Sequence, residues 1–438
     1  MSDTLFPLPD ATPPAPTAPL SPPRVLRPNR QQIELRPADL EGLLPAEHRA
    51  RLVWQFVESL DLQALYARVL AVDGHAGRPA IDPAILLALW LYATLQGVGS
   101  ARALARLCEE HDAYRWLCGG VSLNYHTLAD FRVEPEAELD ELLTSSVAAL
   151  MAAGAVKLQR VAQDGVKVRA HAGRGSFRRA IRLARLRAEA SAQVEALKRE
   201  VHDDPAATTR RLAAARARAA REQQHRVTEA LAQLPAIIAR RQKAGGKGPA
   251  RVSTTDPDAR RMTMADGGVR PAFNGQFMTA TDSQVIVGVA LTNAGTDLGQ
   301  LQPMLEQVQR RYGQCPREVL ADGGYVALGE IRALAALGCR VYAPPKAPRG
   351  HPRARDARRR NDEATTEWRT RMATEAGQTV YKERAATSEC VNAAARNRGL
   401  QQLVVRGLRK GRAILLWFAL AHNLLRAAAL RPAPVTVG

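Results

Sequence analysis

The first part of the chain, from about residue 33 to 152, repeats apolar residues at the three- and four-residue steps of amphipathic helices. One helix is predicted from Asp82-Pro83 through AILLALWLYATLQ, because Asp caps helix N-termini and Pro suits the first helical position. A second is predicted from Ser100, after two glycines, and a third from NYHTLADFR. Short helices separated by glycine fit a helix-turn-helix module that binds DNA, and they also fit a bundle that packs or dimerises without contacting DNA.

From Arg160 the pattern changes to the two-residue alternation of a strand, in RVAQDGVKVRA. Two further strands are predicted in PAFNGQFMTATD and SQVIVGVALTN, with a turn at Asp282-Ser283. An amphipathic helix in GQLQPMLEQVQRRYG, a buried strand in REVLADGGY, a helix in GEIRALAALG, a short strand in CRVYAPP and a helix from about Tyr381 follow. This order of elements matches an α/β RNase H-like core.

A long stretch at about 177–250 interrupts that core. Apolar residues recur at three- and four-residue steps in FRRAIRLARLRAEASAQVEALKREV, and helix-forming residues resume after Pro205 and continue to about Arg241. The pattern predicts a helical hairpin or short coiled coil. Its many arginines are predicted to form a solvated charged face, with contact to DNA as the alternative.

The composition of the chain indicates what kind of partner and compartment to expect. The formal net charge of +19 over 438 residues favours a polyanionic partner, because neutralised phosphates release condensed counterions. Arginine excess also accompanies an Ala-rich composition of this kind, so charge alone does not decide. The first 32 residues are rich in proline and are predicted to be a disordered leader. The five cysteines form no CxxC pair and are predicted to be reduced thiols in a cytosolic protein.

Three carboxylates carry the candidate chemistry. Asp164 in VAQDGV and Asp322 in VLADGGY each follow a short apolar run and precede Gly, and Glu389 lies in the helix-forming stretch YKERAATSEC. The three are too far apart in sequence for a local metal-binding loop, so a shared site requires tertiary folding. Carboxylates on rigid strands and a helix suit a pair of Mg²⁺ ions that clamps the attacking and leaving oxygens of a phosphodiester.

Five stretches around these acids resemble bacterial insertion-sequence DDE transposases, most closely the insertion-sequence family numbered 1182. They are VAQDGVKVRAHAGRGSFRR, STTDPDARRM, ATDSQVIVGVALTNAGTDLGQL, EVLADGGY and YKERAATSECVNAAARNRGL, and the resemblance runs from roughly residue 33 to 428. It implies an N-terminal all-helical DNA-binding domain at 33–152 and an α/β RNase H-like catalytic domain at 153–438. That domain is interrupted by the coiled-coil-like helical insertion and by a basic loop at about 345–376.

The resemblance also implies roles for residues near the third acid. Related transposases carry a Tyr, an Arg, the catalytic Glu and a Lys on one helix, which here look like Tyr381, Arg384, Glu389 and Arg396. Arg396 departs from the expected Lys and keeps the positive charge. Glu383 is an alternative third acid.

Further basic and aromatic residues lie near the acids. Lys167 and Arg169 follow Asp164 at alternating positions, where they contact backbone phosphate or pair with the acids. The run RGHPRARDARRRND belongs to the predicted basic loop, and Trp368 follows it. We expect Trp368 to pack in the core, with stacking on an unpaired base as the alternative.

The expected activity is that of a DNA transposase. Such an enzyme binds the terminal inverted repeats of its insertion sequence, cleaves the ends by metal-dependent phosphodiester hydrolysis and joins the 3′-OH ends to target DNA. Two Mg²⁺ ions are the expected cofactor, with Mn²⁺ as a substitute and no organic cofactor. The expected partners are double-stranded DNA and a second copy in the DNA complex, with no membrane, in the bacterial cytoplasm at the nucleoid. The alternatives are a nuclease without strand joining and a catalytically silent DNA-binding regulator.

Overall fold

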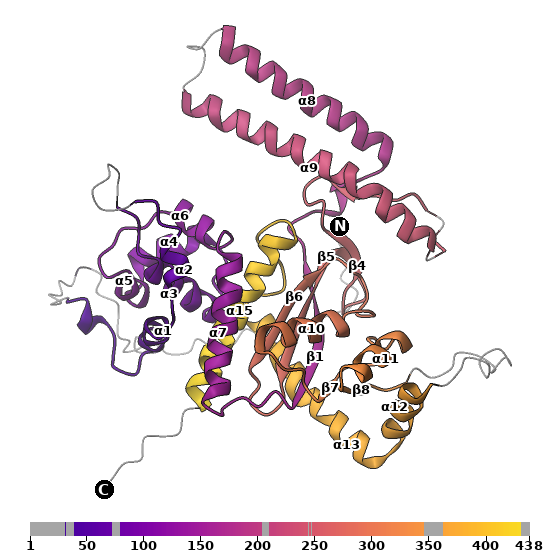
Figure 1. Ribbon diagram of the computed structural model, residues 1–438. Helices are drawn as coiled ribbons and strands as arrows, with labels where there is room; N and C mark the ends of the chain where they lie inside the picture. The colour runs from indigo at the N-terminus through magenta and orange to yellow at the C-terminus, as the bar shows by residue number, and fades with distance from the viewer. Residues whose placement is uncertain are drawn as a thin grey trace, which may run out of the picture. The chain divides into compact units, whose positions relative to one another are not determined.

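The computed structural model describes most of the chain (Figure 1), namely residues 31, 39–71, 79–203, 210–243, 245–246, 248–345 and 362–430. The Pro-rich leader predicted at 1–32 lies outside the described residues apart from Gln31, and so does the arginine-rich run at 346–361. The described residues from Leu40 onward belong to one compact unit.

A mixed six-stranded sheet forms the centre of this unit, with β1 in its middle. β5 and then β6 pair antiparallel on one side of β1, and β7 and then β8 pair parallel on the other. The order β6-β5-β1-β7-β8 is that of an RNase H-like sheet, and β4 adds to β5. The strands are β1 (Arg160–Arg169), β4 (Arg260–Thr263), β5 (Val269–Ala280), β6 (Ile286–Thr292), β7 (Glu318–Leu320) and β8 (Arg340–Tyr342).

Helices cover both faces of the sheet. On one face α15 (Leu408–Leu430) packs closely, and Phe418 lies 5.3 Å from Phe277 of β5 between ring centroids. A side chain at Gly275 would place its Cβ 2.8 Å from Leu415, so the close approach of α15 requires glycine there. On the other face lies α10 (Leu301–Tyr312), which ends at Gly313 as its sequence predicts.

The helices before the sheet are α1 (Arg49–Glu58), α2 (Gln63–Tyr66), α3 (Pro83–Leu95), α4 (Ala101–Glu110), α5 (Asp112–Cys118), α6 (Tyr125–Phe131) and α7 (Glu136–Ala152). The predicted starts of α3 and α4 are confirmed, because the side chains of Asp82 and Ser100 accept hydrogen bonds from Ala84 N and Ala103 N. α3 is buried nearly all round, so it is the core helix of this part.

α15 also joins these helices to the sheet. Its Trp417 donates from Nε1 to Arg132 O at 2.9 Å, and its Arg412 pairs with Glu136 and Asp140 of α7. The predicted boundary at 152/153 is therefore not a break in packing. By length and composition α15 is the one helix among the described residues that is apolar enough to cross a membrane, but it is mostly buried inside the protein, as a core helix is.

The stretch predicted as a helical insertion forms α8 (Ala180–Asp203) and α9 (Arg210–Lys243), which extend together away from the sheet (Figure 1). Leu183, Ala230, Leu234 and Val252 make a small core of their own. β2 (Phe177–Arg178) and β3 (Val252–Ser253) pair at the base.

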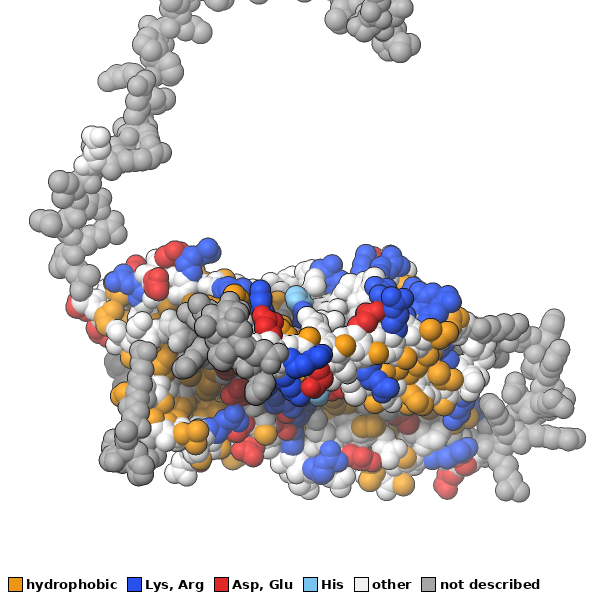
Figure 2. Space-filling model, turned by 90° about the horizontal axis from the view of Figure 1, so that it is seen from above, with side chains coloured by type: hydrophobic (Ala, Val, Ile, Leu, Met, Phe, Trp, Pro, Cys, Tyr) orange, Lys and Arg blue, Asp and Glu red, His pale blue; other side chains and the backbone are white. Residues whose placement is uncertain are grey.

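Basic side chains on this hairpin have acidic neighbours. Arg185 bonds to Glu189 at 2.8 Å and Lys198 to Glu195 at 2.7 Å. Seen from above, basic side chains are spread over this side of the molecule with acidic ones between them (Figure 2). This arrangement favours a solvated charged face over a concentrated patch for DNA.

The remaining helices are α11 (Leu328–Ala336), α12 (Glu363–Ala373), α13 (Glu375–Arg384) and α14 (Cys390–Asn397), with a π-helical turn (Ala385–Glu389) between the last two. The basic loop predicted at about 345–376 is thus wrong beyond Glu363, where Asp362 caps α12 by accepting from Thr365 N. Trp368 is buried and donates from Nε1 to Ala343 O, so the prediction of a core position is confirmed.

Acid is expected to loosen the contact between α15 and the sheet. His422 is buried, its Nε2 lies 2.8 Å from Gln284 O, and burial lowers its pKa to about 4. The pKa of His422 is lower in the folded protein than in the unfolded chain. The buried neutral imidazole therefore contributes fully to the free energy of unfolding above about pH 6.5, and this contribution is lost as the pH falls towards 4. Urea unfolding should show a loss of about 2 kcal/mol between pH 7.5 and 5 that is absent from His422→Gln. Equal losses in both proteins would contradict this assignment.

Candidate active site

Asp164 lies on β1, and Asp322 lies two residues beyond the end of the neighbouring parallel strand β7. Ala162 of β1 is opposite Leu320 of β7, and each aspartate is two residues beyond that pair. Because side chains two residues apart share a face of a sheet, this register places the two carboxylates side by side on one face. Asp322 also accepts a hydrogen bond from Gly324 N at 2.5 Å, which orients it at the end of the strand.

The third acid lies on the helix that covers this face. Between α13 and α14 the chain forms a π-helical turn of five residues, Ala385–Glu389, directly after Arg384. In a π-helix the hydrogen bonds join residues five apart, and Arg384 and Glu389 have that spacing. Glu389 therefore lies directly over Arg384, with 3.6 Å between Arg384 Nη2 and Glu389 Oε1. With regular helical spacing Glu389 is expected one residue further round, so the π turn is what brings it into line. The Arg384 guanidinium also lies 5.8 Å from the Tyr381 ring centroid.

Asp164 is held from several directions. Its carboxylate accepts from Gly165 N at 2.9 Å and from Asn392 Nδ2 at 3.1 Å, and Arg384 Nη1 lies 3.5 Å away. Burial raises the pKa of Asp164 to about 6, and the charge of Asp322 adds to the rise, while the Gly165 N–H and Arg384 oppose it. Sequence reasoning missed Asn392, whose position three residues after Glu389 on the same helix was the available signal.

A buried polar network supports β1 from the opposite face. Asp297 Oδ1 accepts from Asn274 Nδ2 at 2.7 Å and from Gln276 Nε2 at 2.9 Å. Gln276 also accepts from the Tyr325 hydroxyl at 2.6 Å. A Cβ on Gly165 would lie 2.6 Å from Asp297 Oδ1, so the network fills the space beneath that residue. Asp297 and Tyr325 were not predicted, because their approach depends on how two loops fold back over the sheet.

The other predicted residues lie further from the acids. β1 pairs with β5 without a bulge, so Lys167 and Arg169 lie on the face opposite to Asp164. Arg396 is exposed near the end of α14. The alternative acid Glu383 pairs with Arg160 at 2.6 Å, away from Asp164.

The donor set suits a divalent cation, because Mg²⁺ prefers carboxylate oxygens and Asp164 and Asp322 are adjacent. Among the described residues, however, no three acidic, His or Cys side chains are gathered closely enough to hold an ion. The Arg384 guanidinium accounts for this separation of the acids, because it lies between the carboxylates of Asp164 and Glu389, at the position where a metal ion would contact both. The Glu389 side chain is 64% exposed and has room to turn toward the other acids.

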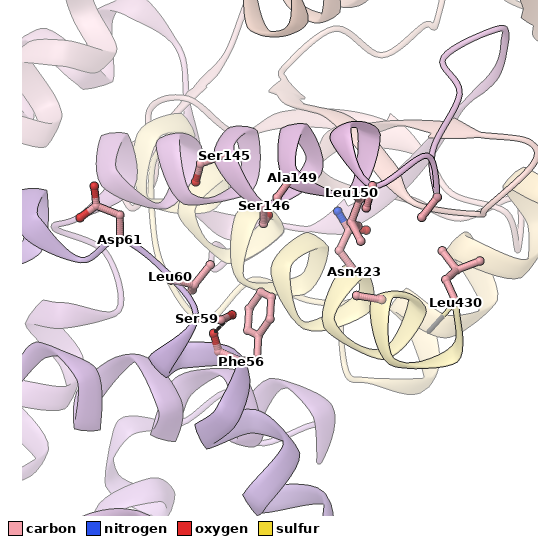
Figure 3. Close-up of a pocket in the computed structure, with 13 residues that line it drawn as sticks. Phe56, Ser59, Leu60, Asp61, Ser145, Ser146, Ala149, Leu150, Asn423 and Leu430 are labelled. Atoms are coloured by element: carbon pink, nitrogen blue, oxygen red, sulfur yellow. Dashed lines mark hydrogen bonds between the residues drawn. The ribbon is translucent and has the colours of Figure 1, made fainter. Parts of the chain in front are cut away.

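A cavity elsewhere offers no comparable chemistry. It has a volume of about 410 Å³ and opens between α1, α7 and α15, with Phe56, Leu60, Leu150 and Leu430 among its lining (Figure 3). In the part of the chain that the structure describes, Asp61 is the one acidic residue that lines it. The cluster at β1 is therefore the candidate active site.

Two family models match parts of the chain. The model described as Transposase domain (DUF772) matches residues 38–134, and the model described as Transposase DDE domain matches residues 339–428. The second match contains Glu389, whereas Asp164 and Asp322 lie outside both. The comparisons with curated proteins and with solved structures gave no match. The two matches support a DNA transposase of the DDE type, which implies an RNase H-like core, DNA as partner and a divalent metal.

Proposed function

We propose that this chain is the transposase of an insertion sequence, of the family numbered 1182, that cuts and joins DNA with Asp164, Asp322 and Glu389. It binds the terminal inverted repeats, hydrolyses a phosphodiester at each end, and joins the freed 3′-OH to target DNA. The observation that carries the proposal is the register that places Asp164 of β1 beside Asp322, just beyond the parallel strand β7, beneath a π-helical turn that ends at Glu389.

Asp164, Asp322 and Glu389 would hold two Mg²⁺ ions, or Mn²⁺ in their place. The bound metal supplies a lowered pKa for the attacking water or 3′-OH and a counter-charge for the phosphate oxygens. In this scheme Arg384 leaves Asp164 for the incoming phosphate, because a phosphate offers the guanidinium two acceptor oxygens. Asn392 keeps its hydrogen bond to Asp164 and fixes the direction of that carboxylate.

The remaining residues bind DNA. Tyr381, beside Arg384 on α13, contacts the strand next to the cleaved bond, and Arg396 contacts a phosphate further along. Lys167 and Arg169, on the opposite face of β1, belong to the outer part of the DNA path. The helices at 33–152 recognise the element end, and two copies act together because both ends must be paired before joining.

The test uses labelled duplexes that carry the repeats flanking this gene, incubated with the full-length protein and either Mg²⁺ or EDTA. We expect nicking at the repeat boundary and joined products, both only with Mg²⁺. A matched duplex with a scrambled repeat should bind less tightly and remain uncut.

Two other results would replace the proposal. Metal-dependent cleavage of both duplexes without joining would indicate a nuclease. Repeat-specific binding without cleavage in Mg²⁺ or Mn²⁺ would indicate a DNA-binding regulator.

A further inference from the structure

A cavity of about 330 Å³ beside α14 is lined by two arginines and, among the described residues, by no acidic side chain. Arg132 comes from the end of α6 and Arg398 from the end of α14. Each has a buried guanidinium nitrogen, Nε of Arg132 and Nη1 of Arg398, without a hydrogen-bond partner among the described residues. Arg132 Nη1 donates to Gly99 O, and the two guanidinium groups lie over the rings of Trp90 and Phe418, but neither has a carboxylate partner in the described part of the chain. An anionic ligand would supply the missing counter-charge. The cavity is therefore suited to an anion.

A second hollow, of about 290 Å³, is lined by Arg169, Arg174 and Arg270, and no acidic residue of the described ranges lines it. Arg270 is paired with Asp266 at 2.6 Å. The structure gives no ion pair for the exposed Arg169 and Arg174 with any described residue. Their charges are available to a ligand from solvent.

The two hollows meet at one residue. Gln402 lines both, and the chain on either side of it is joined to the end of β1. Arg169 N donates to Gln401 O at 3.0 Å, and Leu403 N donates to Arg169 O at 2.8 Å. The arginines thus lie on either side of one backbone bridge.

We propose that Arg169, Arg174, Arg270, Arg132 and Arg398 form one track, here called the arginine track, that binds consecutive phosphates of a DNA strand. The inference rests on the proposed function, which makes DNA the ligand. Phosphate groups suit the track because they are anionic, evenly spaced and able to accept two hydrogen bonds from one guanidinium.

The track lies within reach of a strand bound at the acids, which would pass the end of β1 to meet Arg169 on the opposite face. Arg169 is five residues beyond Asp164 on β1, which is about 17 Å of extended chain. Arg398 is nine residues beyond Glu389 on the continuing helix, about 14 Å along its axis. At about 3.4 Å of rise per nucleotide, both distances correspond to four or five nucleotides from the cleaved phosphate.

The experiment measures binding of the full-length protein to a labelled duplex carrying one element end, as a function of salt concentration. Arg169→Gln with Arg174→Gln, and Arg398→Gln alone, are compared with Arg310→Gln, an exposed arginine on α10 that lines neither hollow. Each lost phosphate contact should lower the slope of log K against log salt by about 1 and weaken binding at moderate salt by roughly tenfold. Arg310→Gln should match the wild type.

Thermal unfolding separates binding from folding. Arg398→Gln removes a half-buried charge without a carboxylate partner and also its contact with the Phe418 ring, so its melting temperature should stay close to that of the wild type. If Arg398→Gln melts at a lower temperature than the wild type, the salt slope of the variant that lacks the exposed Arg169 and Arg174 decides the proposal. If the arginine-track variants have the same salt slope as Arg310→Gln and the wild-type protein still cuts element ends, the arginine track is wrong and the proposed function is not affected. A wild-type protein that binds no DNA would overturn the proposed function as well.

Discussion

Asp164→Asn, Asp322→Asn and Glu389→Gln are each expected to lower strand cleavage and joining by on the order of 10³-fold, with DNA binding retained. Each change removes one negative charge and keeps the shape of the side chain. The charge is what a divalent cation needs from its ligands, whereas the proposed DNA contacts are made by arginines elsewhere. Cleavage of an end-labelled duplex in single-turnover conditions, beside an anisotropy measurement of binding, gives both quantities.

Glu383→Gln is the matched control for the third acid. Glu383 lies on the same helical segment and pairs with Arg160, so its loss should leave cleavage within a few-fold of the wild type. If Glu383→Gln abolished cleavage and Glu389→Gln did not, the assignment of the third acid would be reversed. Full activity in all four variants would remove the acids from the reaction.

Gly165→Ala is expected to destabilise the protein by about 2 kcal/mol and to lower cleavage at least tenfold. The new methyl group would lie 2.6 Å from Asp297 Oδ1 and Gln276 Nε2, so either β1 or the network beneath it must move. Movement of β1 displaces the adjacent Asp164, and small displacements of a reacting group are costly.

Urea unfolding and single-turnover cleavage measure the two effects. Gly329→Ala, in α11, provides the control because no atom lies within 4 Å of its added Cβ, and a helical alanine is slightly stabilising. If Gly165→Ala has the stability and activity of the wild type, the polar side chains beneath β1 can move away from the added methyl group without destabilising the protein.

The sequence predicted the strands β1, β5, β6, β7 and β8 in their order and the helices that begin at Asp82 and Ser100, because short-range pattern and capping determine these features. It also located three acids on the elements expected of an RNase H-like core. It did not predict the short strands β2, β3 and β4. It did not place Lys167 and Arg169 relative to Asp164, since their face depends on whether a bulge occurs in β1. The continuous pairing of β1 with β5 places both on the face opposite to Asp164.

Other features of the site lie beyond local pattern. In a regular α-helix the side chains of Arg384 and Glu389 would point in different directions. The π-helical turn brings them together, and such a turn has no clear sequence signal. Asp297 meets Gln276 through tertiary folding of a loop, and nothing in TNAGTDLGQL distinguishes its Asp from an ordinary turn residue. The predicted loop up to 376 was wrong because an Asp cap at 362 starts a helix that the basic composition obscured.

The position of α15 has a consequence for how the protein is made. Asn423 accepts from Ile286 N and donates to Ile286 O, both at 2.8 Å, and Phe418 covers Phe277, yet α15 leaves the ribosome after every strand it covers. The sheet emerges with one apolar face bare, and the acids gain a finished scaffold only when translation has passed Leu430. A product truncated before Leu408 should therefore aggregate rather than cut DNA, so incomplete synthesis does not release a partly active enzyme into the cell.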